Sequence, residues 1–140
     1  MNEPEKYCVH PIGIVRSALR SREEAPKQGF EGAPDAWLEI YPAFMEALEG
    51  IALHSEIVVL TWFHQARRDA LKVHPRGDST RPLSGVFATR SPDRPNPIGL
   101  HRVTVLEIDK LRGVRVHPLE AIDGTPIVDI KPAPAASKAE

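Results

Sequence analysis

The chain has 140 residues, of which 41% are hydrophobic and 26% charged, as in an ordinary globular protein with a core of its own. Its formal net charge is −1, which argues against a general nucleic-acid binder. Cys8 is the single cysteine, which excludes an internal disulfide and a cysteine-based metal site. We expect a packed thiol there, at the first strand, rather than a nucleophile.

No targeting segment is visible in the sequence. The first residues lack a basic stretch followed by an apolar run, and no stretch of about 18 apolar residues occurs. We therefore expect no secretory leader, no membrane contact and a cytoplasmic protein, with which a single cysteine is compatible.

Apolar residues alternate with polar ones in many segments, which predicts a mainly β fold. The run at 55–63 is the most apolar and is rich in β-branched and aromatic residues, so it is expected to form a buried central strand. Strands are expected at residues 9–17, 36–41, 55–63, 85–89, 100–108, 114–119 and 127–130.

The segments between these strands are polar and broken by proline and glycine. A long loop covers 20–34, a charged excursion covers 67–82, and a short helix begins at Pro42. We predict a mainly β, single-domain β-barrel over residues 1–132, with one or two short helices and a flexible tail at 133–140.

Charge is distributed unevenly along the chain. Residues 29–63 hold six acidic and no basic residues, whereas residues 64–102 hold eight basic and three acidic ones. A local positive field of this kind attracts phosphate groups even on a near-neutral protein. The alternative is a set of solvated arginines without a partner, and the residues alone leave both open.

The stretch 88–100 contains three prolines, each of which fixes φ near about −65° and lacks an amide N–H. The residue before each proline is pushed toward extended geometry. A helix and a central strand are therefore excluded, and a stiff loop remains, which loses little entropy when a ligand binds. This proline loop carries Arg90, Arg94 and Asn96; the alternative is a connection with no further role.

Common catalytic signatures are absent from the sequence. The chain has no glycine-rich nucleotide motif and no G-x-S-x-G nucleophile turn. Its six histidines show no metal-ligand spacing, so we expect no metal site.

Four short segments stand out together. They are Pro26-Lys27-Gln28-Gly29, Trp62-Phe63-His64-Gln65, the proline-rich run from Gly85 to Leu100, and Asp123-Gly124-Thr125-Pro126 with Asp129-Ile130-Lys131-Pro132. In combination they resemble the signatures of the TrmO family, also called TsaA-like or UPF0066. The resemblance covers residues 8–132, nearly the whole chain.

The resemblance implies a β-barrel methyltransferase that acts as a homodimer and uses S-adenosyl-L-methionine as its cofactor. Characterised members methylate the exocyclic nitrogen of threonylcarbamoyladenosine, the modified base beside the anticodon of certain tRNAs, so tRNA is the expected substrate. By similarity the proline loop shapes the pocket wall, and the cofactor contacts Pro26, Lys27, Gln28, His64, Gln65, Arg90, Leu100, Asp123, Gly124, Thr125 and Pro126.

The chemistry of the cofactor fits these residue types. Arg90 or Lys27 can pair with its carboxylate, and Asp123 can take its ammonium or a ribose hydroxyl. Backbone carbonyls in the proline loop can receive the ammonium or the adenine amine as well. The sulfonium already activates the methyl group, so the protein mainly supplies alignment and a dry site.

The acceptor nitrogen must lose a proton as the methyl group arrives, and the catalytic base is unassigned, with His64 and Asp129 as candidates. Asp129 can equally pair with Lys131 or a turn amide, and His64 can close the end of a core strand. Arg94 either braces the proline loop by bonding carbonyls or contacts tRNA or a partner subunit.

Two residues depart from the family pattern: His101 stands where a small residue is common, and Ala133 stands where an aromatic one is. Two further functions stay open. A small-molecule methyltransferase is suggested by the near-neutral charge, and a cofactor-binding module without catalysis, such as a sensor, is the third hypothesis.

Overall fold

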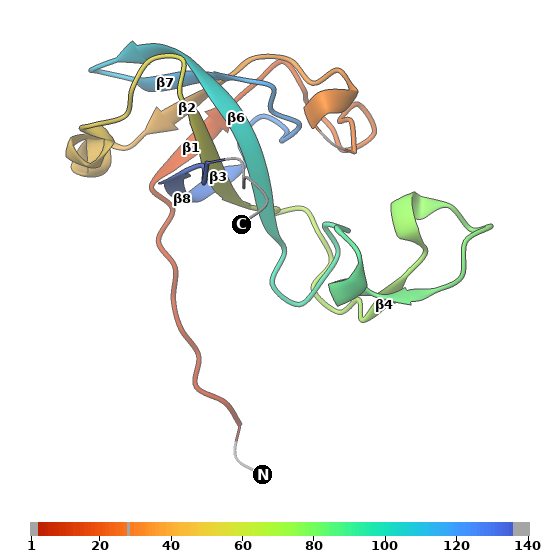
Figure 1. Cartoon of the computed structure of the whole chain (residues 1–140). Helices are drawn as coiled ribbons and strands as arrows, with labels where there is room; N and C mark the ends of the chain where they lie inside the picture. The colour runs from red at the N-terminus through yellow and green to blue at the C-terminus, as the bar shows by residue number, and fades with distance from the viewer. Residues whose placement is uncertain (1–2, 28, 136–140) are drawn as a thin grey trace.

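The chain folds into a closed antiparallel barrel from which a long arm projects (Figure 1). The computed structural model describes residues 3–27 and 29–135. Six strands close the barrel in the order β1-β2-β7-β6-β3-β8, and β8 pairs back with β1. These strands are β1 (Gly13–Arg16), β2 (Ala36–Ile40), β3 (Glu56–Trp62), β6 (Ile98–Asp109), β7 (Gly113–His117) and β8 (Pro126–Pro132). The predicted mainly β, single-domain barrel is confirmed.

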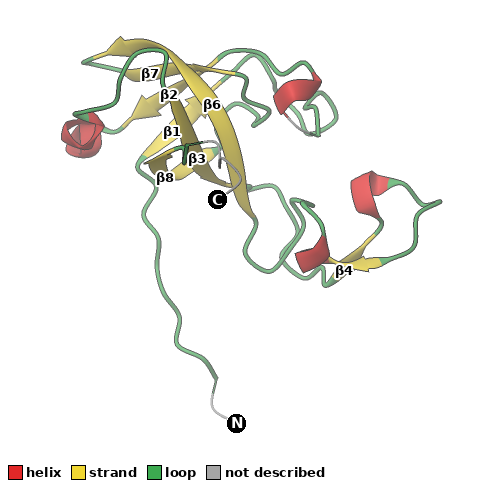
Figure 2. Cartoon of the chain, in the orientation of Figure 1, coloured by secondary structure: helices red, strands yellow, loops and turns green. Residues whose placement is uncertain are grey.

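Helical structure in the described residues consists of short 3₁₀ turns (Figure 2). η2 occupies the place of the predicted short helix, with Pro42 as its first residue and Gly50 just beyond it at a φ of 97°. The others are single turns, too short for apolar periodicity to reveal. The four are η1 (Gly29–Glu31), η2 (Pro42–Leu48), η3 (Pro75–Gly77) and η4 (Val86–Ala88).

Alternate side chains of each strand fill the barrel interior, because successive residues in a strand point to opposite faces. The register places Val15 of β1 opposite Leu38 of β2, and Leu38 opposite Val114 of β7. Small β-branched residues dominate, since a ring of six strands encloses little space. Fully buried are Val15, Leu38, Val59, Val105, Val114, Val116 and Ile127.

The arm comprises residues 64–97, which leave the barrel after β3 and return at β6. Its regular pairing among the described residues is the short ladder of β4 (Lys72–Val73) and β5 (Ser84–Gly85). A ribbon of this size is not stable alone in water. It also presents large apolar side chains to solvent, namely Leu71 (70% exposed), Leu83 (58%) and Phe87 (83%).

The predicted first strand is longer than the strand that forms. β1 begins at Gly13 rather than at residue 9, because Pro11 lacks the N–H that would continue the ladder, and residues 3–11 are exposed. The expectation of a packed thiol is therefore wrong, since Cys8 lies in solvent.

The strand predicted at 85–89 is also wrong. Only Gly85 of that stretch belongs to a strand, and the chain then turns into η4, where the N–H and the hydroxyl of Thr89 both bond the Val86 carbonyl. The partner strand β4 is too short to extend the pairing. The predicted tail at 133–140 lies mostly outside the described residues, so that boundary stays a prediction.

Gly113 offers a test of the barrel packing. It has a φ of 139°, and a Cβ added there would collide with the backbone carbonyl oxygen of Leu38 on the neighbouring strand. We expect Gly113→Ala to lower the free energy of unfolding by about 2–4 kcal/mol, because positive φ and overpacking both oppose the folded state. Urea titration measures this loss.

Gly50→Ala is the matched control, because Gly50 also has positive φ, at 97°, but open space around its Cβ position. It should lose only the conformational part, about 1–2 kcal/mol. Equal losses in the two variants would contradict the close approach of Gly113 to β2.

Candidate functional site

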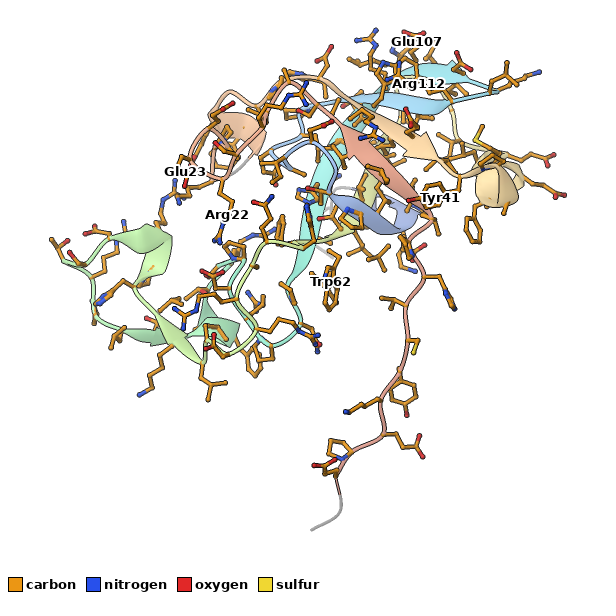
Figure 3. All side chains as sticks on the ribbon, turned by 180° about the vertical axis from the view of Figure 1, so that it is seen from behind. Arg22, Glu23, Tyr41, Trp62, Glu107 and Arg112 are labelled. Atoms are coloured by element: carbon orange, nitrogen blue, oxygen red, sulfur yellow. The ribbon has the colours of Figure 1, made fainter. Side chains whose placement is uncertain are left out.

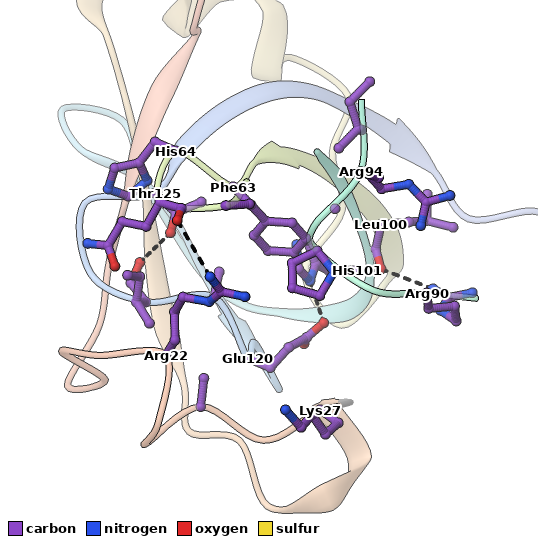
Figure 4. A pocket seen from close by; sticks show the side chains of 18 of the residues that line it. Arg22, Lys27, Phe63, His64, Arg90, Arg94, Leu100, His101, Glu120 and Thr125 are labelled. Carbon is purple, nitrogen blue, oxygen red and sulfur yellow. Dashed lines mark hydrogen bonds and ion pairs between the residues drawn. The ribbon is translucent and has the colours of Figure 1, made fainter. Parts of the chain in front are cut away.

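A cavity of about 510 Å³ opens at the end of the barrel from which the arm leaves (Figure 4). This cavity, hereafter the pocket, has the size of a small-molecule site. Segments far apart in the sequence line it: the β1–β2 connection, the start and end of the arm, the start of β6, and the turn before β8. The lining residues fall in 22–27, 63–66, 89–101 and 120–125.

The proline loop forms one wall, and it is fastened to residues 63–68 by hydrogen bonds. The Phe63 N–H donates to the Pro97 carbonyl at 2.8 Å, and the Arg94 N–H donates to the Arg67 carbonyl at 3.0 Å. The Arg68 guanidinium donates to the Pro95 carbonyl at 2.8 Å. Residues 89–97 form neither helix nor strand, as predicted. The expectation is wrong at the two ends of the stretch 88–100, because Ala88 ends η4 and Ile98–Leu100 open β6, where no proline interrupts the pairing with β3.

Side chains inside the loop complete this fastening. The Arg94 guanidinium donates to the carbonyls of Thr89 and Ser91 at 3.0 and 3.1 Å. Of the two roles open for Arg94, the structure therefore supports bracing. Asp93 accepts the Arg67 N–H at 2.9 Å and also pairs with Arg22, which reaches across from the β1–β2 connection (Figure 3).

Positive charge surrounds the pocket. Arg22 and Arg94 are engaged as just described, whereas Arg90 makes one long hydrogen bond, 3.4 Å to the Leu100 carbonyl. Lys27 makes none to another described residue and is exposed. These two cations are thus available to an anionic ligand group, for which an arginine fork is well suited.

The floor of the pocket is a polar chain of three residues. His101 is 2% exposed, and its Nε2 lies 2.7 Å from the hydroxyl of the fully buried Thr61. Its Nδ1 lies 2.6 Å from a carboxylate oxygen of Glu120, whose side chain is 15% exposed. The Phe63 and His101 rings make a T-shaped contact, with an interplanar angle of 88°. Glu120 is the one acidic residue among the described residues that line the pocket.

Gly99 makes this floor possible. It pairs with Thr61 across β3 and β6, and a Cβ at Gly99 would collide with the side chains of Thr61 and Phe63. The absence of a side chain at Gly99 therefore lets His101 reach the Thr61 hydroxyl.

Most residues assigned to the cofactor by resemblance meet in the pocket. Those lining it are Pro26, Lys27, His64, Gln65, Arg90, Leu100 and Thr125. Gly124 and Pro126 are outside the lining, and Gln28 lies outside the described residues.

Asp123 points elsewhere. Its carboxylate accepts the Ser17 N–H at 3.0 Å and pairs with Arg20 at 3.2 Å, and it lines a second surface hollow with Arg16. The Asp129 carboxylate accepts its neighbour's N–H and pairs with Lys131 at 3.3 Å, outside the pocket lining. Of the two candidate bases, His64 is therefore the one that faces the pocket.

Sequence reasoning gave no role in the site to Arg22, Thr61, Phe63 or Glu120. Phe63 lies in one of the four segments that carry the resemblance but has no role of its own there, and Arg22 carries no signal that separates it from surface residues. Glu120 does, because it is a lone carboxylate in the apolar run Leu119–Ile122, where a charge needs a partner.

Ion pairs outside the pocket are conventional surface pairs. On the outer face of β3 and β6 the Arg102 guanidinium hydrogen-bonds and attracts the Glu56 carboxylate, which lowers the pKa of Glu56. In the arm, Arg67 lowers the pKa of Asp69 in the same way. Within residues 3–27 and 29–135, no group of three or more potential ligands is placed to hold a metal ion. No helix in the described part is long and apolar enough to cross a membrane.

Known proteins share this fold and much of this sequence. A protein of Methanothermobacter thermautotrophicus named a probable S-adenosyl-L-methionine-binding protein is 44% identical over 124 residues, which is 89% of this chain and 88% of that protein. An Archaeoglobus fulgidus protein named an S-adenosyl-L-methionine-binding protein is 41% identical over 86% of this chain and 85% of its own length.

A crystal structure of TrmO from Pseudomonas aeruginosa matches with a TM-score of 0.75 and 33% identity. The match covers 97% of this chain and 60% of that one, so the chain spans less than two thirds of the solved TrmO protein. The family model for the tRNA-methyltransferase O N-terminal domain matches residues 14–137. The chain therefore belongs to the family of the tRNA-methyltransferase O N-terminal domain.

Proposed function

We propose that the chain is an S-adenosyl-L-methionine-dependent methyltransferase that binds its cofactor in the pocket and methylates the exocyclic nitrogen of threonylcarbamoyladenosine in tRNA. The family and its relatives give the cofactor as S-adenosyl-L-methionine. One observation carries the assignment of the site: a rigid wall, free cations and a single carboxylate converge on one cavity.

The pocket fits the parts of the cofactor. Arg90 and Lys27 suit the methionyl carboxylate, because both are cations with bonding capacity to spare. Phe63 supplies an apolar surface for the adenine. The cofactor itself supplies a methyl group already activated by the sulfonium. The protein's task is then to hold that methyl group in line with the acceptor, and the fastened proline loop suits this task because it needs little ordering.

The acceptor nitrogen belongs to a urea-like group and needs a base nearby. We propose His64, which is exposed at the pocket and makes no hydrogen bond to another described residue. A tRNA substrate would place the protein in the cytoplasm. The local excess of basic residues in 64–102 supports a polyanionic acceptor.

We further propose that the protein is a homodimer in which a second copy covers the arm. The arm exposes three large apolar side chains around a ladder too short to stand alone. Burial against a second copy would remove that surface from water.

The cofactor assignment predicts a loss of affinity in Arg90→Ala. Removing a hydrogen bond to a charged group should weaken S-adenosyl-L-methionine binding by about 1.5–3 kcal/mol, measured by calorimetry. Arg81→Ala is the control, because Arg81 pairs with Asp78 in the arm, away from the pocket. A loss below twofold in Arg90→Ala would remove Arg90 from the cofactor site.

The acceptor assignment predicts transfer of radiolabelled methyl to total tRNA from cells that make threonylcarbamoyladenosine. No transfer is expected to tRNA from cells that lack this modification, because the acceptor nitrogen is then absent. Transfer to a small molecule alone would favour a small-molecule methyltransferase. Cofactor bound but unchanged in single-turnover assays with each acceptor would favour a binding module and reject the proposal.

The dimer proposal predicts that the wild-type chain sediments as a dimer and that Phe87→Asp shifts it toward the monomer, since a charge in an apolar contact is costly. Leu111→Asp is the control, because Leu111 is 94% exposed in the β6–β7 turn, far from the arm in sequence. A wild-type monomer, or equal behaviour of the two variants, would contradict an interface at the arm.

A further inference from the structure

We propose that Glu120 receives the α-ammonium group of S-adenosyl-L-methionine, and that the buried pair Thr61 and His101 holds Glu120 in place for it. This inference rests on the proposed assignment of the pocket as the cofactor site. It gives a role to a carboxylate and a histidine that lie outside the four segments that carry the resemblance.

Glu120 is placed to meet a ligand. Its side chain is 15% exposed and lines the pocket, and one oxygen is bonded to His101 at 2.6 Å. That bond is the one hydrogen bond of Glu120 within the part of the chain that the structure describes. Figure 4 shows the Glu120 carboxylate next to the His101 ring, with a dashed line marking the bond between them. The second oxygen is therefore the acceptor left for a bound group.

The charges of the pocket explain why a cation needs Glu120. Arg22, Lys27, Arg90 and Arg94 all line the cavity and would repel an ammonium group that has left water. Glu120 is the acidic group among the described lining residues that offsets this repulsion. The ammonium is favoured over the sulfonium, because its three N–H groups donate hydrogen bonds to a carboxylate and the sulfonium has none.

The buried pair of Thr61 and His101 fixes the Glu120 side chain in place. With the proton on Nδ1 donated to Glu120, Nε2 accepts the Thr61 hydroxyl at 2.7 Å, so a neutral imidazole satisfies both contacts. A free glutamate side chain would lose considerable rotamer freedom on binding a ligand, and the bond to His101 reduces this entropic cost. Thr61 is fully buried and His101 is held by Phe63, so both bonds start from rigid positions.

Calorimetry with three probes tests the assignment: S-adenosyl-L-methionine, S-adenosylhomocysteine and methylthioadenosine. The first two carry the ammonium, and only the first carries the sulfonium; methylthioadenosine has neither. Glu120→Gln keeps the shape and an acceptor oxygen for His101. We expect this variant to bind the first two probes about 10-fold to 100-fold more weakly than the wild type, and methylthioadenosine less than twofold more weakly.

Glu107→Gln is the matched control, because Glu107 pairs with Arg115 on the outside of the barrel. It should leave all three affinities unchanged. Loss for S-adenosyl-L-methionine alone would assign Glu120 to the sulfonium and overturn the proposal. Equal loss for all three probes would indicate a structural role and overturn it as well.

Arg90→Ala separates this inference from the assignment of the pocket. If Arg90→Ala weakens binding and Glu120→Gln does not, the pocket stands and the role of Glu120 is wrong. If neither weakens binding, the pocket itself is wrong. If Glu120→Gln loses affinity for the three probes in the expected pattern, the inference is supported whatever the result for Arg90→Ala.

Thr61→Val tests the supporting pair, since valine keeps the shape and removes the hydroxyl. We expect S-adenosylhomocysteine to lose about 2-fold to 10-fold in affinity relative to methylthioadenosine, the effect of one neutral hydrogen bond acting through His101. A merely structural role would change both affinities equally and would contradict positioning by Thr61.

Discussion

The attachment of the proline loop to residues 63–68 is the constraint on which the site depends. Prolines donate no backbone hydrogen bonds, and residues 89–97 join no ladder, but their carbonyls still need donors. Phe63 and Arg68 supply these donors to Pro97 and Pro95. The two ends of the arm are thereby joined beside the barrel mouth, and these hydrogen bonds hold the wall of the pocket in one shape.

The barrel and the pocket form one continuous interior. Along β3 the inward positions run Ile57, Val59, Thr61, and along β6 toward the same end they run Val103, His101, Gly99. Both strands therefore change from aliphatic to polar or minimal side chains at the pocket end. The aliphatic part holds the barrel together through apolar burial. The polar end can be buried without penalty because each of its groups has a partner.

The parts of this structure that follow from local periodicity can be predicted from the sequence. Strand pairing and the direction of individual side chains cannot. Alternation predicts the strands, and the prolines predict the stiff loop. The strand at 85–89 fails because its partner is two residues long, which no local pattern records. Asp123 sits in the expected turn, but Ser17 and Arg20 hold its carboxylate toward the other side. Residue types typical of turns predict the backbone conformation at a position, but they do not predict where its side chain points.

The absence of α-helices from the described residues determines how such a pocket can recognise charge. Nucleotide-binding folds place anions at helix N-termini, where backbone N–H groups converge. Among the described residues the barrel has no α-helix that could do this, and the pocket instead gathers the side-chain cations Arg90 and Lys27. These cations attract the carboxylate of a zwitterionic ligand, but they also repel its ammonium group. Glu120, held by His101 and Thr61 inside the barrel, would attract the ammonium group, and one buried carboxylate is enough for this.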